Sequence, residues 1–128
     1  MPALVATGSP TADVVVGEEG RTIGQANNVF VFPGVGLGAI VAEAREITGD
    51  AFLVAARELA GLVSPPRLAA GALYPPIAEL RRGARAVAIA VVRELRDSGY
   101  GRHYRDEEIE PAVDAAMWRP EYLQLVGG

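Results

Sequence analysis

The feature that most constrains the fold is an apolar helical pattern over residues 77–95. Within it, apolar side chains recur every three or four residues, which places them on one face of a helix of about five turns: Ile77, Leu80, Ala84, Val87, Ala88, Val91 and Leu95. Pro76 stands at a permitted N-terminal position, and Gly99 follows the expected end. The opposite face carries charged residues of the kind that ordinarily face solvent: Glu79, Arg81, Arg82, Arg85, Arg93, Glu94 and Arg96. We therefore expect a largely helical chain built around this segment.

Shorter elements are expected before this helix. Residues 4–7 read as the end of a strand, and residues 14–20 as an extended excursion with a tight turn. One helix is predicted over residues 35–48. A second is predicted after a cap at Asp50 and before the prolines at 65 and 66. Its expected apolar face consists of Phe52, Ala56, Leu59, Ala60 and Val63.

Two adjacent carboxamides, Asn27 and Asn28, stand directly before the apolar residues 29–32. An amide side chain offers one acceptor and two donors without a charge, so such a pair can form a recognition corner for a small polar ligand. The alternative is an Asn turn, in which the side chain caps nearby backbone N–H groups. The position of the two asparagines in the sequence, taken alone, favours the turn.

Residues 34–39, GVGLGA, fit the glycine pattern of a dinucleotide-binding loop and follow a strand-like segment at residues 29–32. That loop should follow its strand directly, and a second strand with an acidic residue should come about 20 positions later. Here Pro33 intervenes, and further helical sequence follows. We therefore expect these small residues to let two helices approach closely.

Composition excludes several classes of function. The chain has 128 residues, a formal net charge of −4 and no cysteine, so we expect one domain without disulfides, in a reducing cytoplasm. No basic patch favours nucleic acid, and no apolar run reaches the ~18 residues of a membrane span. All 12 basic residues are arginine, which excludes a lysine general base or Schiff base. Counted with glycine and without tyrosine, about 59% of the residues are apolar against the usual 45 to 50%, which suggests burial against a further partner or a coding bias.

The last thirty residues differ in character. Asp106, Glu107 and Glu108 would suit acid–base or metal chemistry, but acids also favour the first turn of a helix, and we prefer that interpretation. Trp118, Tyr122 and Leu123 are interpreted as an anchor to another domain or subunit.

Several motifs in order along the chain resemble one family. They are ATGSP at 6–10, GQANNVFVFPGVGLGA at 24–39, EITGDAFLVAARELA at 46–60, GALYPPIAELR at 71–81 and MWRPEYL at 117–123. Together they resemble the C-terminal portion of malic enzyme, which oxidises L-malate with NAD or NADP and a divalent metal, Mg or Mn, and decarboxylates the product to pyruvate.

The resemblance implies an α/β fold, the C-terminal part of a Rossmann-type NAD-binding domain, of which this chain is the mostly α-helical portion with a short strand-like N-terminal segment. Residues 1–98 would form that part, with strand and turn at 1–28 and a helical cap at 29–98, and residues 99–128 a C-terminal arm. Asn27 and Asn28 would bind substrate, and Gly8, Ser9 and Asn28 the cofactor. The catalytic tyrosine and lysine and the metal ligands of the family lie upstream of the part resembled, so we assign no catalytic or metal-binding residue here.

The predicted function is a malic enzyme segment that supplies the asparagine corner and is inactive alone, in a truncated or split gene product. Its expected partners are the N-terminal portion of a malic enzyme or a second copy of the chain, with no nucleic acid and no membrane. The alternative is a non-catalytic helical partner or oligomerisation module derived from malic enzyme. A third possibility, an autonomous nucleotide binder, rests on the glycine run alone.

Overall fold

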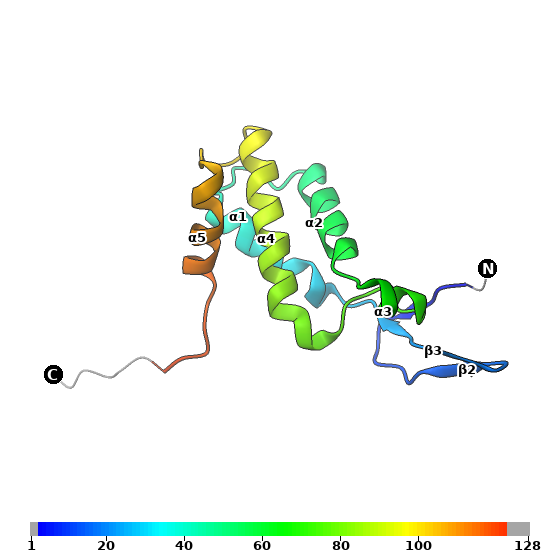
Figure 1. Cartoon of the computed structure of the whole chain (residues 1–128). Helices are drawn as coiled ribbons and strands as arrows, with labels where there is room; N and C mark the ends of the chain where they lie inside the picture. Colours follow the sequence, from blue (N-terminus) through cyan, green and yellow to red (C-terminus); the bar gives the residue numbers. More distant parts are fainter. Residues whose placement is uncertain (1–2, 123–128) are drawn as a thin grey trace.

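The computed structural model describes residues 3–122, which form helices packed side by side with two small sheets at one end (Figure 1). The strands are β1 (Ala6–Thr7), β2 (Val14–Val16), β3 (Glu19–Arg21) and β4 (Gly24–Gln25). The helices are the 3₁₀ helix η1 (Asn28–Phe30), α1 (Phe32–Val41), α2 (Gly49–Gly61), α3 (Pro65–Ala69), the 3₁₀ helix η2 (Ile77–Glu79), α4 (Leu80–Asp97) and α5 (Asp106–Ala116). The expected fold, mostly helical with a short strand-like start, is confirmed.

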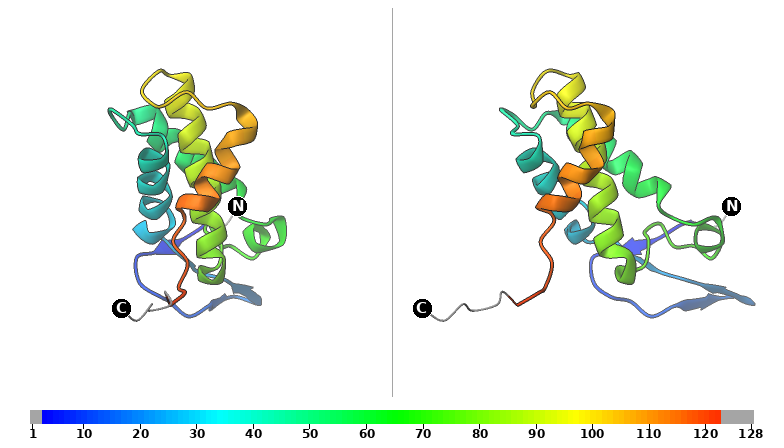
Figure 2. Two further views of the ribbon diagram at one scale, coloured as in Figure 1. Left: turned by 90° about the vertical axis from the view of Figure 1, so that its left-hand side faces the viewer. Right: turned by 60° about the vertical axis from the view of Figure 1, so that its left-hand side comes forward.

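Helix α4 forms the centre of the body, and α1, α2 and α5 pack around it (Figure 2). Its buried residues are Gly83, Ala84, Val87, Ala88, Ile89, Val91, Val92 and Leu95. The predicted helix at 77–95 is therefore confirmed in its main part. Its first residues instead form η2, where Ile77 is 49% exposed. Gly99 follows the C-cap with φ +77, a left-handed conformation that favours glycine.

Two glycines of α1 make the contact with α4 possible. A Cβ added to Gly34 would lie 2.6 Å from Cβ of Val87, and one added to Gly38 would lie 2.8 Å from Cβ of Val91. Both distances are too short for real atoms, so these positions must lack a side chain. Gly36 has open space instead. The glycine run is thus a helix-packing surface, as predicted, and lies inside a helix rather than in a phosphate-binding loop.

The predicted boundaries of α1 were wrong at both ends. Residues 28–30 form η1 rather than a strand, because Oδ1 of Asn27 accepts the N–H of Val29 and starts a helical turn. Pro33 then occupies the first turn of α1, where its missing N–H costs no hydrogen bond. At the other end α1 stops at Val41 rather than 48, and Glu43 adopts φ 48.

Helix α2 also differs from its prediction. Its N-cap is Thr48, whose Oγ1 accepts the N–H of Ala51 at 3.2 Å, while Asp50 lies in the first turn. The buried face is the row Ala51, Ala55 and Leu59, so the predicted apolar face was wrong except for Leu59. The buried row thus lies one position before the predicted one, with Ala51 and Ala55 in place of Phe52 and Ala56, and Phe52 is left 41% exposed.

Helix α5 packs directly on the body. Ile109 and Val113 are fully buried and belong to the same hydrophobic core as α4. The hydroxyl of Tyr104, just before α5, donates to the carbonyl of Val41 at 3.2 Å. The predicted division of the chain at residue 98 stays a prediction, and Leu123 lies outside the described residues.

Two short sheets form the N-terminal part. Strands β1 and β4 pair in parallel, with Ala6 opposite Gly24 and Thr7 opposite Gln25. Strands β2 and β3 form an antiparallel hairpin, in which Gly17 turns the chain with φ +68, and this hairpin extends away from the helices (Figure 2). In the part of the chain that the structure describes, no helix is long and apolar enough to cross a membrane.

Candidate functional site

The predicted site residues lie in the two segments that follow the carboxyl ends of the parallel strands. Because β1 and β4 run in the same direction, the residues that follow them lie at the same end. Gly8 and Ser9 follow β1, and Asn27 and Asn28 come shortly after β4. The N–H of Ala26 donates to the carbonyl of Thr7 at 2.8 Å, which carries the pairing up to this edge. Ligands of open α/β sheets bind outside the carboxyl ends of the strands, so this is the expected place for a binding site.

The turn after β1 is held by side chains. The hydroxyl of Thr7 donates to the carbonyl of Ser9 at 2.9 Å, and that of Thr11 donates to the same carbonyl at 3.2 Å. Nε2 of Gln25 donates to the carbonyl of Gly8 at 3.2 Å. A Cβ added to Gly8 would meet no atom within 4 Å. The missing side chain therefore leaves an open face of backbone that a flat group could approach.

The two asparagines play different structural parts. Oδ1 of Asn27 caps η1 through the N–H of Val29 at 3.0 Å, which is the turn that spacing favoured. Asn28 opens η1, and its side chain is exposed. An amide keeps two donors after its oxygen is used, so a cap does not prevent Asn27 from binding a ligand through Nδ2. The assignment of both residues to substrate binding stays a prediction.

A loop from the middle of the chain supports the same edge. A Cβ on Gly24 would lie 3.1 Å from the backbone nitrogen of Leu73, so the loop at 71–74 packs closely on β4. The ring of Tyr74 lies 5.8 Å from that of Phe30 in η1. Nε of Arg67 donates to the carbonyl of Tyr74 at 2.6 Å. Sequence reasoning singled out the segment around Tyr74 as a motif but did not predict this supporting contact, since it depends on pairing across the fold.

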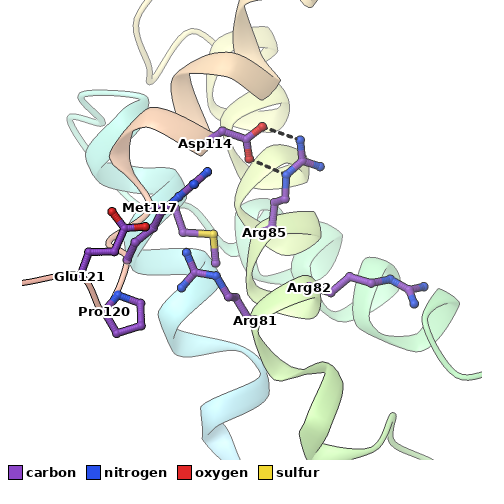
Figure 3. Close-up of a pocket in the computed structure, with 8 residues that line it drawn as sticks. Arg81, Arg82, Arg85, Asp114, Met117, Pro120 and Glu121 are labelled. Atoms are coloured by element: carbon purple, nitrogen blue, oxygen red, sulfur yellow. Dashed lines mark hydrogen bonds and ion pairs between the residues drawn. The ribbon is translucent and has the colours of Figure 1, made fainter.

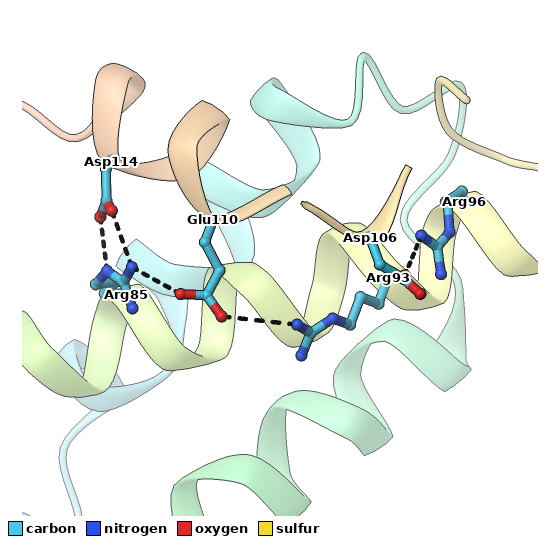
Figure 4. A network of polar contacts seen from close by, with 6 residues as sticks. All are labelled: Arg85, Arg93, Arg96, Asp106, Glu110 and Asp114. Atoms are coloured by element: carbon cyan, nitrogen blue, oxygen red, sulfur yellow. Dashed lines mark hydrogen bonds and ion pairs between the residues drawn. The ribbon is translucent and has the colours of Figure 1, made fainter. Parts of the chain in front are cut away.

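The charged residues of α4 and α5 form a structural network rather than a site (Figure 4). Arg85 donates to both carboxylate oxygens of Asp114, at 2.6 and 2.8 Å, and to Glu110 at 3.2 Å. Arg96 donates to Asp106 at 2.6 Å. These hydrogen bonds lower the pKa of Asp114 and of Asp106 below the ordinary aspartate value. The expectation that this face of α4 simply faces solvent was therefore wrong at Arg85 and Arg96.

The acids at the start of α5 serve the helix. Oε2 of Glu108 accepts the N–H of Arg105 at 2.8 Å, which satisfies a backbone donor at the start of α5, and Arg105 lowers the pKa of Glu108. This agrees with the preferred interpretation of residues 106–108. Within residues 3–122, no group of three or more His, Cys, Asp or Glu side chains could hold a metal ion.

A hollow of about 720 Å³ lies between α4 and the segment that follows α5 (Figure 3). Its lining is Arg81, Arg82, Arg85, Asp114, Met117, Arg119, Pro120 and Glu121. None of the residues at the strand edge contributes to it, and two of its charges, Arg85 and Asp114, already neutralise each other. On the same segment the aromatic side chain of Trp118 is 75% exposed.

The parallel strands, the turns that follow them and the helices behind them belong to the α/β class of folds. A comparison with protein families supports this class: the family model described as "Malic enzyme, NAD binding domain" matches residues 2–96. The match covers most of the chain. The chain therefore belongs to the malic enzyme family, and residues 2–96 match the model of the family's NAD-binding domain.

Curated relatives agree with the family match. The chain is 38% identical over 120 residues to an NAD-dependent malic enzyme of Pseudomonas aeruginosa (strain UCBPP-PA14), which covers 94% of this chain and 21% of that protein. It is also 38% identical to the NAD-dependent malic enzymes of Vibrio parahaemolyticus, over 122 residues, and Proteus mirabilis, over 120 residues, with the same coverage. The chain thus spans about a fifth of the length of these relatives.

Proposed function

We propose that this chain serves as the C-terminal segment of an NAD-dependent malic enzyme and supplies one corner of its active site. The observation that carries the proposal is the parallel pairing of β1 and β4, because the segments with Gly8 and Ser9 and with Asn27 and Asn28 follow the same end of the two strands. The relatives support the choice of reaction, oxidative decarboxylation of L-malate to pyruvate, and of NAD rather than NADP, because their names state both NAD and malic enzyme.

The proposed roles follow the chemistry of the side chains. The exposed amide of Asn28 binds the carboxylate or hydroxyl of malate and the nicotinamide end of the cofactor, and it stays neutral while charge moves during the redox step. Asn27 borders the same corner through Nδ2. Gly8, with open space where its side chain would be, lets the nicotinamide ring lie against the backbone beside Ser9. NAD itself would supply the hydride acceptor.

The chain needs the rest of an enzyme for turnover. Malate oxidation requires a base for the hydroxyl proton and a divalent metal, Mg or Mn, that polarises the developing ketone. The sequence contains no lysine, and the described residues 3–122 contain no cluster of ligands that would fit the metal. We therefore assign both functions to the portion of a malic enzyme that this chain does not match, and we expect the isolated chain to be inactive.

A second candidate is a helical partner module that assembles with a malic enzyme subunit or with a second copy of itself. The exposure of Trp118 and of Tyr122 in the segment after α5 favours it, because aromatic side chains contribute strongly to protein interfaces. Such a module would form stable dimers without a complementing portion and would not restore activity.

Segment replacement tests the proposed function. The 120 matching residues of the Pseudomonas aeruginosa enzyme are replaced by this chain, and NADH formation from L-malate is followed by absorbance with Mn. We expect activity from the replaced enzyme and none from the isolated chain. An inactive but folded and correctly assembled replacement, or turnover by the chain alone, would contradict the proposal. Sedimentation of the isolated chain detects the dimers that the partner module requires.

A further inference from the structure

One side chain joins the two halves of the candidate site. Gln25 lies at the end of β4, opposite Thr7 of β1, and its Nε2 donates to the carbonyl of Gly8 at 3.2 Å. The two residues are 17 positions apart in the sequence. This bond therefore connects the turn of Gly8 and Ser9 to the strand that leads into the asparagine pair.

The turn has a second set of restraints, but these are local. The hydroxyls of Thr7 and Thr11 both donate to the carbonyl of Ser9, and they lie 2.8 Å from each other. They fix the shape of the turn without tying it to β4. With the carbonyl of Gly8 bonded to Gln25, both carbonyls of the turn have side-chain partners before any ligand arrives. Such preorganisation lowers the cost of ordering a site when a ligand binds.

The backbone alone does not provide the same restraint. The N–H of Ala26 donates to the carbonyl of Thr7, which pairs the strands up to Thr7. Gly8 is the next residue, and glycine permits a wide range of φ and ψ. Gly8 is exposed, and a Cβ added to it would meet nothing within 4 Å, so no atom packs against its side-chain position. The Gln25 amide is the side-chain contact that restrains Gly8 from the β4 side.

We propose that Gln25 is a positioning residue that sets the place of the Gly8 and Ser9 turn relative to Asn27 and Asn28. The inference rests on the proposed function, in which the turn faces the nicotinamide and the asparagines face the substrate. Gln25 touches neither ligand in this account. It acts through the backbone of Gly8, so loss of its amide should weaken the binding of NAD more than the binding of malate.

The kinetic test uses the segment-replaced enzyme with Gln25→Met, which keeps the length of the side chain and removes the donor. One exposed hydrogen bond corresponds to a rise of about threefold to tenfold in the KM for NAD. We expect the KM for malate at saturating NAD to stay within about twofold and the melting temperature to stay unchanged. The proposal would be overturned if the KM for NAD were the same with and without Gln25→Met. It would also be overturned if the substitution raised the KM for NAD and the KM for malate by the same factor.

Thr22→Val is the matched control. The hydroxyl of Thr22 donates to Asp13 at 3.3 Å, so this variant also removes one exposed side-chain hydrogen bond from the N-terminal part. The bond between the N–H of Thr22 and the carbonyl of Ala70 is retained. We expect the control to leave the KM for NAD unchanged. A control that raises this KM as much as Gln25→Met would show a general loss of structure and contradict the positioning role.

A second measurement keeps the inference testable even if the replaced enzyme has no activity. Amide resonances of the chain of 128 residues are recorded by NMR for the unaltered chain and for Gln25→Met. The inference predicts shifted resonances for Gly8 and Ser9, with those of the buried residues Ile109 and Val113 unchanged. Unshifted resonances at Gly8 and Ser9 would overturn it. Failure of the proposed function is recognised separately, because the segment-replaced enzyme would then be inactive even with the unaltered Gln25.

Discussion

The helical body and the N-terminal strands differ in how they are held. In the described part of the chain, every buried hydrophobic residue lies between Phe30 and Val113. Before Phe30, the buried residue is Gly24, which is covered by the loop at 71–74. The strands β1 and β4 form a sheet of two parallel strands, and parallel sheets are normally covered on both faces. The buried core therefore lies in the helices, while the proposed site lies in a part of the chain with little buried surface.

The substitution that we expect to destabilise the chain most lies in α5. Ile109→Ala removes a fully buried side chain from the core shared with α4, and we expect the free energy of unfolding to fall by about 3 kcal/mol. Urea denaturation of the isolated chain measures it, with the exposed Glu107→Ala as control. A loss as small as that of the control would show that residues 99–128 form a separate arm rather than part of the body.

A substitution at the contact between α1 and α4 should have the second-largest effect on stability. Gly34→Ala places a Cβ 2.6 Å from Val87 and 2.8 Å from the carbonyl oxygen of Ala84, and we expect a loss of about 2 kcal/mol from overpacking. Gly36→Ala is the matched control two residues away, with nothing within 4 Å. Because alanine favours helix, the control should gain up to about 1 kcal/mol. Equal effects at the two positions would contradict the packing account of the glycine run.

A smaller effect distinguishes the two asparagines. Asn27→Ala removes the cap of η1 and should lower the free energy of unfolding by about 1 kcal/mol. Asn27→Asp retains an acceptor and should restore most of that loss. Asn28→Ala, at an exposed side chain, should leave stability unchanged. Thermal unfolding followed by circular dichroism compares the three variants. A destabilising Asn28→Ala would show that this amide has a structural role.

The smallest expected change in stability comes from the ion pair of Arg85 and Asp114, and it depends on pH. Arg85 lowers the pKa of Asp114 in the folded chain, so the folded state binds protons less readily than the unfolded state. The resulting stability is present above the ordinary aspartate pKa and is lost as the pH falls through about 4 and below. Arg85→Met should therefore flatten the dependence of unfolding on pH between about 7 and 3. An unchanged pH profile would contradict a role for this pair in stability.

The sequence predicts the body well where a single helix face decides the outcome. The pattern from Leu80 to Leu95 is one amphipathic face, and its burial follows directly from it. The face of α2 was predicted one position too late, as Phe52 and Ala56 rather than Ala51 and Ala55, because both rows are apolar and both repeat every four residues. Periodicity within one helix does not decide which of two neighbouring apolar rows packs against another helix.

The residues of the candidate site could be named from motifs, but the contacts that support them could not. Its residues Gly8, Ser9, Asn27 and Asn28 were named from motifs, and the parallel pairing of β1 and β4 places them at one edge. The roles of Gln25 and Tyr74 were not predicted, since both depend on which carbonyl or ring lies opposite them in space. The ion pairs of Arg85 were missed likewise, because Asp114 lies 29 positions away in the sequence.

The most direct test of the account is the effect of Asn28→Ala in the segment-replaced malic enzyme. Loss of an amide that binds a charged substrate should lower kcat/KM for malate by about tenfold to hundredfold. The melting temperature should stay the same, because the side chain of Asn28 is exposed and Asn27 provides the cap of η1. An enzyme that carries Asn28→Ala and retains the full kcat/KM would contradict the claim that this edge of the chain is part of the active site.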